Sequence, residues 1–320
     1  MDANESPYDL PEKIKEKTFA RLRRTPYNRY PQADSRRLKG LLADYLKVGQ
    51  ERLIVGNGSD EIINYLISAC VSPGDRVVFP HPSFSMYRIL AEVHNAEVVT
   101  APLDDNWGIT DRLLEAAGPA SLVFLGYPNN PTGNCFSRKK INELRETTEG
   151  LVVLDEAYFE FSGKTFIDEV KKDAPLVVLR TLSKGFGLAG IRTGILIAPP
   201  SLVEGIQPVK LPYNLNRLSQ VTAEETLKNR CQVFERVEKI KEETERIFSF
   251  LAGAGFNPYP TAANFVLFNP SEPQKIYDRL LDEGIRIRRF SDPPLSGCLR
   301  VTTGTTEENN HLINCLETLK

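Results

Sequence analysis

The sequence predicts an α/β protein with a mostly parallel seven-stranded sheet in a large domain and a smaller α+β domain after it. Two observations carry this prediction: seven short runs rich in Val, Ile and Leu, and amphipathic helical patterns between several of them. Near-continuous apolar strands separated by helices are typical of a parallel sheet covered on both faces. We expect an N-terminal arm at residues 1–29, the large domain at 30–205 and the small domain at 206–320.

The elements of the large domain follow from these runs in chain order. Short apolar runs bounded by turn residues indicate buried strands, whereas apolar residues three or four apart indicate helices. Strands are expected at 52–55, 76–79, 97–100, 121–125, 151–155, 175–179 and 194–198. Helices are expected at 59–70, 82–93 and 137–148. This alternation predicts helices that connect neighbouring parallel strands.

The last third of the chain has a mixed pattern. Residues 232–256 read as one long, charged amphipathic helix that is stopped by Gly253 and Gly255. After it, strands are expected at 264–268, 285–290 and 298–303, and helices at 273–284 and 306–320. These elements predict a smaller α+β domain that packs closely on the large one.

The composition excludes several classes of function. The chain has 320 residues, a net charge of −2 and 41% hydrophobic residues, which is typical of an ordinary soluble protein. Lys and Arg are scattered among Asp and Glu, so we expect no nucleic-acid surface and no membrane patch. No apolar run approaches the ~18 residues of a membrane span. Residues 1–17 lack the apolar segment of a signal peptide, so we expect a cytoplasmic protein.

The cysteine and histidine patterns predict reduced thiols and no metal. Five cysteines form an odd set with no C-x-x-C pair, which fits buried thiols in the cytoplasm better than disulfides or a zinc site. No two of the three histidines, His81, His94 and His311, have metal-ligand spacing. We therefore expect neither a disulfide framework nor metal catalysis.

Four unusual segments fall at the carboxyl ends of predicted strands, where open α/β sheets bind their ligands. In "GNGSDEII", glycines allow a tight turn, and Ser59 and Asp60 lie in the cap region of the next helix. Free N–H groups at a helix N-terminus bind anions, so this turn is a candidate phosphate cradle, with an ordinary helix cap as the alternative. The segment lacks the glycine spacing of dinucleotide and nucleoside-triphosphate loops.

The other three segments carry an amide, a carboxylate and an amine. Asn130 lies in the turn "YPNNPTGN", Asp155 ends an apolar strand three residues before Tyr158, and Lys184 follows another strand end. A buried carboxylate needs a cationic partner, and a buried lysine is rare unless it is paired or chemically employed. Pyridoxal 5′-phosphate (PLP) explains the whole set. Its aldehyde takes a lysine amine as a Schiff base, and its ring nitrogen takes a carboxylate partner.

The chain resembles the class I/II aminotransferases, which have the PLP-dependent transferase fold type I, and within them the histidinol-phosphate aminotransferase family. Segments of the family occur in order over nearly the whole chain: "DANESP", "RYP", "GNGSDEII", "PNNPTG", "LDEAYFEF", "RTLSKGFGLAGIRTG" and "LSGCLRVTTGT". The resemblance implies ping-pong transamination in histidine biosynthesis. Histidinol phosphate would give up its amino group and leave as imidazole-acetol phosphate, and 2-oxoglutarate would accept the group and leave as glutamate.

The resemblance also implies roles for individual residues. Lys184 becomes the Schiff-base lysine, Asp155 the partner of the pyridine nitrogen, and Tyr158 and Asn130 the donors to the phenolic oxygen. Phe84 becomes the aromatic ring that stacks on the pyridine, with core packing as its alternative. The neighbourhood of the cofactor phosphate would be formed by Ser59, Asp60, Thr181, Ser183 and Arg192.

Three further residues are assigned to substrate and partner by the resemblance. Tyr30 would reach the cofactor phosphate of a neighbouring subunit, which implies a homodimer with shared active sites; its alternative is a hydrophobic anchor before Pro31. Arg300 would bind the carboxyl end of the substrate, and Arg288 the substrate phosphate. Arg288 and Arg289 alternate on a predicted strand, so one of them is expected to face solvent.

Other functions stay open on the sequence alone. A threonine-phosphate decarboxylase and an aromatic amino-acid aminotransferase are alternatives with the same fold. A non-enzymatic PLP-binding regulator is an alternative of another class. Such regulators carry a helix-turn-helix domain, for which the short acidic arm and the net charge of −2 leave no room.

Overall fold

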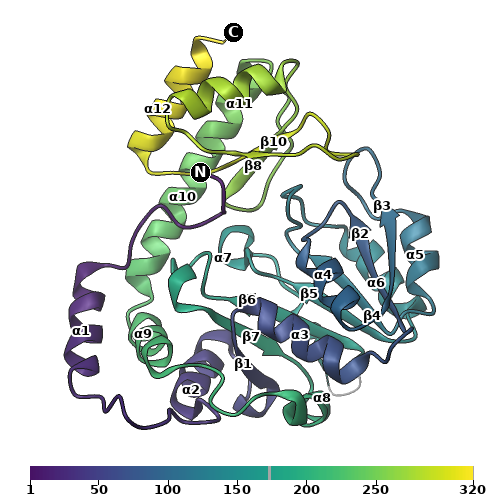
Figure 1. The fold of residues 1–320 in the computed structure, drawn as a ribbon, viewed down its shortest axis with the longest axis vertical. Coiled ribbons are helices and arrows are strands. Elements are labelled where there is room, and N and C mark those ends of the chain that lie inside the picture. The colour runs from purple at the N-terminus through teal and green to yellow at the C-terminus, as the bar shows by residue number, and fades with distance from the viewer. Residues whose placement is uncertain (172–173, 320) are drawn as a thin grey trace.

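The computed structural model describes residues 1–171 and 174–319, and its larger sheet has seven strands (Figure 1). Their order across the sheet is β1–β7–β6–β5–β4–β2–β3. β7 runs antiparallel to both of its neighbours, whereas the other pairings are parallel. The strands are β1 (Leu53–Asn57), β2 (Arg76–His81), β3 (Glu97–Pro102), β4 (Leu122–Gly126), β5 (Leu151–Asp155), β6 (Leu176–Thr181) and β7 (Thr193–Ile197). The predicted α/β fold and its mostly parallel seven-stranded sheet are confirmed.

Helices cover both faces of this sheet because successive strand residues point to opposite sides. In β5, Val152 and Leu154 join one buried cluster, and Leu151 and Val153 join another. The first cluster lies under α2 (Arg36–Leu46), α5 (Asp111–Ala117), α6 (Arg138–Thr147) and α9 (Arg217–Lys228). The second lies under α3 (Ser59–Cys70), α4 (Met86–Val93) and α8 (Pro200–Ile206). The helices predicted at 59–70, 82–93 and 137–148 correspond to α3, α4 and α6.

The smaller sheet is antiparallel, with the order β8 (Phe265–Phe268), β10 (Leu299–Thr302), β9 (Arg288–Arg289). It packs with α11 (Pro273–Asp282), α12 (Thr306–Glu317) and the long α10 (Cys231–Gly253), all of which were predicted. The strand predicted at 285–290 shortens to β9 alone. Lys320, the last residue of the predicted final helix, lies outside the described residues.

The N-terminal arm runs beside both parts of the molecule (Figure 1). Its helix α1 (Glu12–Leu22) is tied to α9 through Arg21, which forms ion pairs with Glu224 and Glu225. Residues before α1 reach the small sheet, where the N–H of Thr302 donates to the carbonyl of Met1 at 2.9 Å. The boundaries 1–29, 30–205 and 206–320 stay predictions. In the part of the chain that the structure describes, no helix has the length and apolar character needed to cross a bilayer.

Candidate active site

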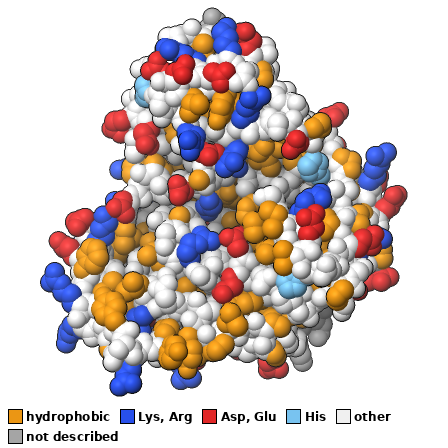
Figure 2. Space-filling model, viewed as in Figure 1, with side chains coloured by type: hydrophobic (Ala, Val, Ile, Leu, Met, Phe, Trp, Pro, Cys, Tyr) orange, Lys and Arg blue, Asp and Glu red, His pale blue; other side chains and the backbone are white. Residues whose placement is uncertain are grey.

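The carboxyl ends of the parallel strands form one wall of a cavity of about 620 Å³ between the two sheets. β4, β5 and β6 end at Gly126, Asp155 and Thr181, and β7 starts at the same edge because it runs the other way. In Figure 2 the surface is hollowed between the upper and lower parts of the molecule, with basic and acidic side chains in the hollow. The predicted site residues that line this cavity are Ser59, Asp60, Phe84, Asn130, Asp155, Tyr158, Thr181, Ser183, Lys184, Arg192, Arg288 and Arg300.

Lys184 places its amine inside this cavity. Its Nζ donates a hydrogen bond to the carbonyl of Ala3 at 3.1 Å and lies 5.9 Å from the centre of the Tyr158 ring. Burial, and after it the positive charge of Arg300, lowers the pKa of Lys184 to about 8. An amine with a lowered pKa is more often neutral, which is the form that attacks an aldehyde.

Asp155 is a buried carboxylate at the end of β5, and only 6% of its surface is exposed. The hydroxyl of Tyr87 donates to its Oδ2 at 2.8 Å, and the N–H of Ala157 donates to its Oδ1 at 3.2 Å. Among the described residues, no cation forms an ion pair with it, and burial raises its pKa to about 6. A protonated pyridine nitrogen is the kind of partner that such a carboxylate lacks.

Tyr158 and Asn130, in the cavity wall, each accept a hydrogen bond from another residue. Asn4 donates its side-chain amide to the hydroxyl of Tyr158 at 2.9 Å, and burial raises the pKa of that phenol. Arg300 donates from Nη1 to Oδ1 of Asn130 at 2.5 Å. Because the amide oxygen of Asn130 is taken by Arg300, its NH₂ group is the part that can donate to a ligand.

The segment expected to form a phosphate cradle lies at the N-terminus of α3. Arg192 pairs with Asp60 (Nη2 to Oδ2, 3.1 Å) and donates to Oγ of Ser183 at 3.4 Å. The turn before the helix needs glycine at Gly58, which has a φ of +86°; a Cβ there would lie 2.4 Å from Nη2 of Arg192. One guanidinium, hydroxyls and a helix N-terminus form a donor set that suits a phosphate group.

Arg300 and Arg288 lie on neighbouring strands of the small sheet and line the same cavity. Arg300 is 6% exposed, burial lowers its pKa, and its Nε has no hydrogen-bond partner among the described residues. Arg288 is half exposed, and its Nε lies 2.7 Å from Oδ1 of Asp2. An anion at Arg288 would compete with Asp2, and one at Arg300 would meet a guanidinium that already donates to Asn130 and Asp2, so the choice between the two arginines stays open.

Phe84 lines the cavity and also packs against the buried cluster under α3 and α4. Its ring meets that of Tyr87 edge to face, with centroids 5.6 Å apart. Stacking on a ligand and core packing are thus both compatible with its position.

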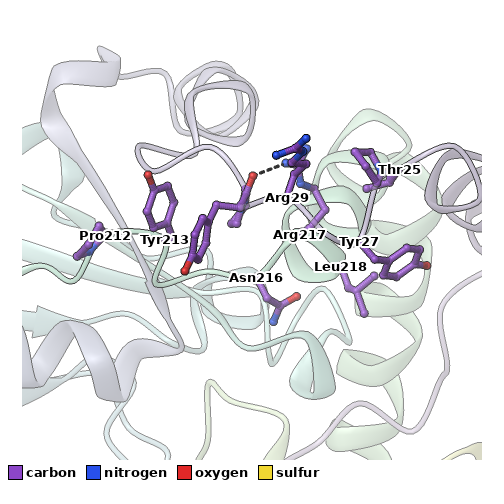
Figure 3. Close-up of a pocket in the computed structure, with 11 residues that line it drawn as sticks. Thr25, Tyr27, Arg29, Pro212, Tyr213, Asn216, Arg217 and Leu218 are labelled. Carbon is purple, nitrogen blue, oxygen red and sulfur yellow. Dashed lines mark hydrogen bonds between the residues drawn. The ribbon is translucent and has the colours of Figure 1, made fainter.

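Tyr30 does not lie in this cavity. Its side chain is 77% exposed and stacks on Tyr213, with ring centroids 4.6 Å apart. Both rings line a separate hollow of about 740 Å³, where Arg217 donates to the carbonyl of Tyr30 at 2.8 Å (Figure 3).

Two site residues were not predicted from the sequence. Tyr87, the second residue of α4, lies in the segment "PSFSMY" three residues after Phe84, which precedes that helix. Asn4 lies within "DANESP", but its contact with Tyr158 joins residues 154 positions apart, so no local pattern indicates it.

Comparison with known proteins agrees with this arrangement. The profile of the family "Aminotransferase class I and II" matches residues 1–316. The histidinol-phosphate aminotransferase of Thermoanaerobacter pseudethanolicus is 40% identical over 325 residues, which cover 100% of this chain and 92% of that protein.

Solved structures give the same result. The histidinol-phosphate aminotransferase of Sinorhizobium meliloti, solved with pyridoxal-5′-phosphate, superposes with a TM-score of 0.91 at 26% identity, covering 100% of this chain and 91% of that one. The histidinol-phosphate aminotransferase of Clostridium acetobutylicum superposes with a TM-score of 0.90 at 27% identity, and the match covers 99% of this chain and 98% of that one. The chain belongs to the aminotransferase class I and II family, and it is a PLP-dependent aminotransferase.

Proposed function

We propose that this aminotransferase exchanges the amino group of histidinol phosphate with 2-oxoglutarate, forming imidazole-acetol phosphate and glutamate in a ping-pong cycle. The relatives at 40% identity over the whole chain carry this activity in their names. The observation that carries the proposal is the pair Arg288 and Arg300, which line the cavity in addition to the phosphate cradle around Arg192. A site for a phosphorylated amine needs cations beyond those that hold the cofactor.

The residues around the cavity fit PLP, so each can be given a task. When bound, PLP supplies an aldehyde for the amine and a conjugated ring that accepts the electron pair released at the substrate α-carbon. Asp155 would keep the ring nitrogen protonated, and Tyr158 and Asn130 would donate to the phenolic oxygen. The neighbourhood of the cofactor phosphate would be formed by Ser59, Asp60, Thr181, Ser183 and Arg192, in which the Asp60 carboxylate pairs with Arg192.

Lys184 has two tasks in this proposal. It first holds the cofactor through Nζ, and the incoming amine displaces it. The freed Nζ would then take the proton from the substrate α-carbon and deliver it to the C4′ carbon of the cofactor. In the second half of the exchange it would move a proton the opposite way. Because its pKa is lowered to about 8, roughly a tenth of this amine is neutral at pH 7 and about half at pH 8, and the neutral form can act as a base.

The two arginines hold the anionic ends of the substrates. A guanidinium binds phosphate or carboxylate through a planar pair of charge-assisted hydrogen bonds. We assign the phosphate of histidinol phosphate to Arg288, which also holds the distal carboxylate of 2-oxoglutarate. Arg300 holds the other carboxylate of 2-oxoglutarate.

A homodimer with shared active sites is part of the proposal. Tyr27, Tyr30, Tyr213 and Leu218 are large apolar residues that are 42% to 77% exposed around one hollow (Figure 3). Exposed apolar side chains gathered in one place mark interaction surfaces, and two-fold dimers are the commonest soluble oligomers. Tyr30 on this surface would reach the phosphate cradle of the second copy. All five cysteines are free, which supports a cytoplasmic location.

A screen of amine donors tests the proposed substrate. Purified PLP-loaded protein is mixed with histidinol phosphate, threonine phosphate, phenylalanine or tyrosine, and 2-oxoglutarate-dependent glutamate formation is measured for each. The proposal expects the highest kcat/KM with histidinol phosphate. Release of CO₂ from threonine phosphate without glutamate formation would identify a decarboxylase. The highest kcat/KM with phenylalanine or tyrosine would identify an aromatic aminotransferase.

A further inference from the structure

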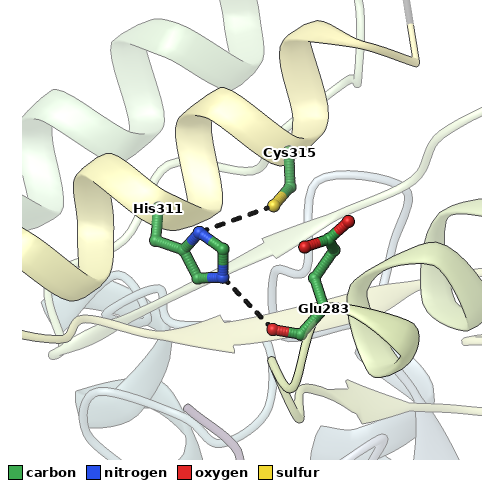
Figure 4. Close-up of side chains that lie close together, drawn as sticks. All are labelled: Glu283, His311 and Cys315. Atoms are coloured by element: carbon green, nitrogen blue, oxygen red, sulfur yellow. Dashed lines mark hydrogen bonds between the residues drawn. The ribbon is translucent and has the colours of Figure 1, made fainter.

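Three side chains with metal-ligating atoms meet in the small sheet's helical layer, outside the active cavity (Figure 4). Glu283 directly follows α11, and His311 and Cys315 lie one turn apart on α12. One ligand atom from each residue lies within 4.8 Å of the other two. Sγ of Cys315 is 3.8 Å from Nδ1 of His311. With zinc–sulfur and zinc–nitrogen bonds of tetrahedral geometry, this separation would be about 3.6 Å.

The histidine is oriented so that one ring nitrogen is free to bind. Its Nε2 lies 3.2 Å from the backbone carbonyl of Glu283, an acceptor only, so Nε2 carries the hydrogen. In the neutral ring, Nδ1 then presents its lone pair toward Cys315. A second hydrogen bond that fixes the ring in this way is characteristic of histidines that bind metals.

Two helix ends place partial negative charge at this cluster, and Arg279 places one positive charge beside it. Glu283 is the C-cap of α11, and Cys315 lies in the last turn of α12, so the partially negative ends of two helices meet here. Arg279 binds Oε1 of Glu283 at 2.7 Å and leaves Oε2 as the oxygen that can coordinate. Cys315 is 6% exposed, so its sulfur is shielded from solvent, while the exposed His311 gives an ion access.

We propose that Glu283, His311 and Cys315 bind one zinc ion through Oε2, Nδ1 and Sγ, with water as the fourth ligand. Thiolate, imidazole and carboxylate together suit zinc and do not suit magnesium or calcium, which prefer oxygen ligands throughout. Binding converts the thiol of Cys315 to a thiolate, so one proton is released for each ion bound. The ion would join the end of α11 to α12 and stabilise the small-sheet region.

Titration with metal alone tests the site. PLP-loaded protein is freed of excess cofactor, and its cysteines are kept as thiols. It is then titrated with zinc and, separately, with cobalt(II). Cobalt in a tetrahedral thiolate site gives intense d–d bands at longer wavelengths than PLP absorbs, so the cofactor does not interfere. The expected result is one ion per chain, these bands, and release of one proton per ion.

Variants decide which residues hold the ion. Removing the ligand in Cys315→Ser should abolish the cobalt bands and weaken zinc binding by more than the ~10–100-fold that loss of an outer-shell partner costs. Because Cys315 is buried, its substitution could disturb folding, whereas His311→Asn changes an exposed side chain. His311→Asn should weaken zinc binding to a similar extent. Cys231→Ser, at an exposed free cysteine, is the matched control and should bind as the unmodified protein does. Absence of cobalt bands, or equal zinc affinity of all four proteins, would overturn the proposal.

Discussion

Asp2 holds both arginines that we propose for substrate anions. Its carboxylate lies 2.7 Å from Nε of Arg288, and its backbone carbonyl accepts a hydrogen bond from Arg300 at 2.7 Å. The N-terminal arm thus places a carboxylate beside the group that would bind the substrate phosphate. A phosphorylated substrate must compete with this carboxylate for Arg288.

Replacing Asp2 should therefore tighten the binding of phosphorylated amines. Half-exposed ion pairs contribute about 0–1 kcal/mol, so Asp2→Asn should lower the KM for histidinol phosphate by up to about fivefold and leave kcat unchanged. Steady-state kinetics with histidinol phosphate and with phenylalanine measures the effect. Asp9→Asn, which removes an exposed acid of the same arm paired with Lys15, is the control. A higher KM, or an equal change with phenylalanine, would contradict competition at Arg288.

Arg288 should govern the choice of phosphorylated over unphosphorylated amines. Losing a charge-assisted hydrogen bond costs ~1.5–3 kcal/mol, and an unpaired phosphate costs more. Arg288→Ala should lower kcat/KM for histidinol phosphate roughly ten- to several-hundredfold, while phenylalanine changes much less. Arg289→Ala alters the exposed neighbour on β9 and should have little effect. Equal losses on both amines would give Arg288 a structural role, and selective loss in Arg300→Ala would assign the phosphate to Arg300.

The extent of the sheet was predictable because its strands are buried on both faces. Runs such as 151–155 contain almost no polar residue, and no alternative element of that length fits them. The helices α1, α2 and α9 were not predicted. The buried residues of α2 include Leu38 and Leu42, one turn apart, but its surface is strongly charged, and nothing local indicates that α9 covers it. β9 is shorter than expected: Ile285 and Ile287 are buried at alternate positions, as in a strand, but pairing with β10 includes only Arg288 and Arg289.

The candidate site was predictable where chemistry follows a strand end, as at Asp155 and Lys184. Its remaining members depend on contacts between distant parts of the chain. Asn4 reaches Tyr158 only because the arm returns to the small sheet, where its N–H donates to the Thr302 hydroxyl. The cluster at His311 was missed for the same reason, since its third member, Glu283, lies 28 residues earlier.

Asp155 should make the stability of the cofactor-free protein depend on pH. Burial raises its pKa to about 6 in the folded chain, above the ~3.9 of an unfolded aspartate. The folded state then binds this proton more strongly, so the contribution of Asp155 is most favourable below about pH 4 and is lost as the pH rises through 6. Relative to Asp155→Asn, the free energy of unfolding should fall by about 2 kcal/mol between pH 4 and 7.

Urea unfolding of the cofactor-free unmodified protein and of Asp155→Asn, at several pH values, measures the difference between their free energies of unfolding. The other titrating groups are the same in both proteins, so their contributions cancel in this difference. Added PLP should reverse the loss in the unmodified protein, since its ring nitrogen supplies the missing cation. A difference in the free energy of unfolding that is constant with pH would show that burial does not raise the pKa of Asp155.

Subunit mixing tests whether active sites are shared. If Tyr30 completes the partner's phosphate cradle, Tyr30→Ala and Lys184→Ala homodimers should each be severely impaired. A mixed dimer would contain one site with both residues intact. Activity should therefore rise toward a quarter of the unmodified level on exchange of equal amounts, since half of the dimers are mixed and each has one intact site. Matched mixing of Tyr27→Ala with Lys184→Ala serves as the control, and an active monomer in sedimentation would refute sharing.

The most direct test of the central claim is to locate the cofactor covalently. Borohydride is added to the yellow protein as purified, the chain is digested, and the labelled peptide is sequenced by mass spectrometry. We expect a single pyridoxyl label on Lys184, which lines the same cavity as Asp155 and Arg192. A label on any other lysine, or no visible absorption and no label, would contradict it.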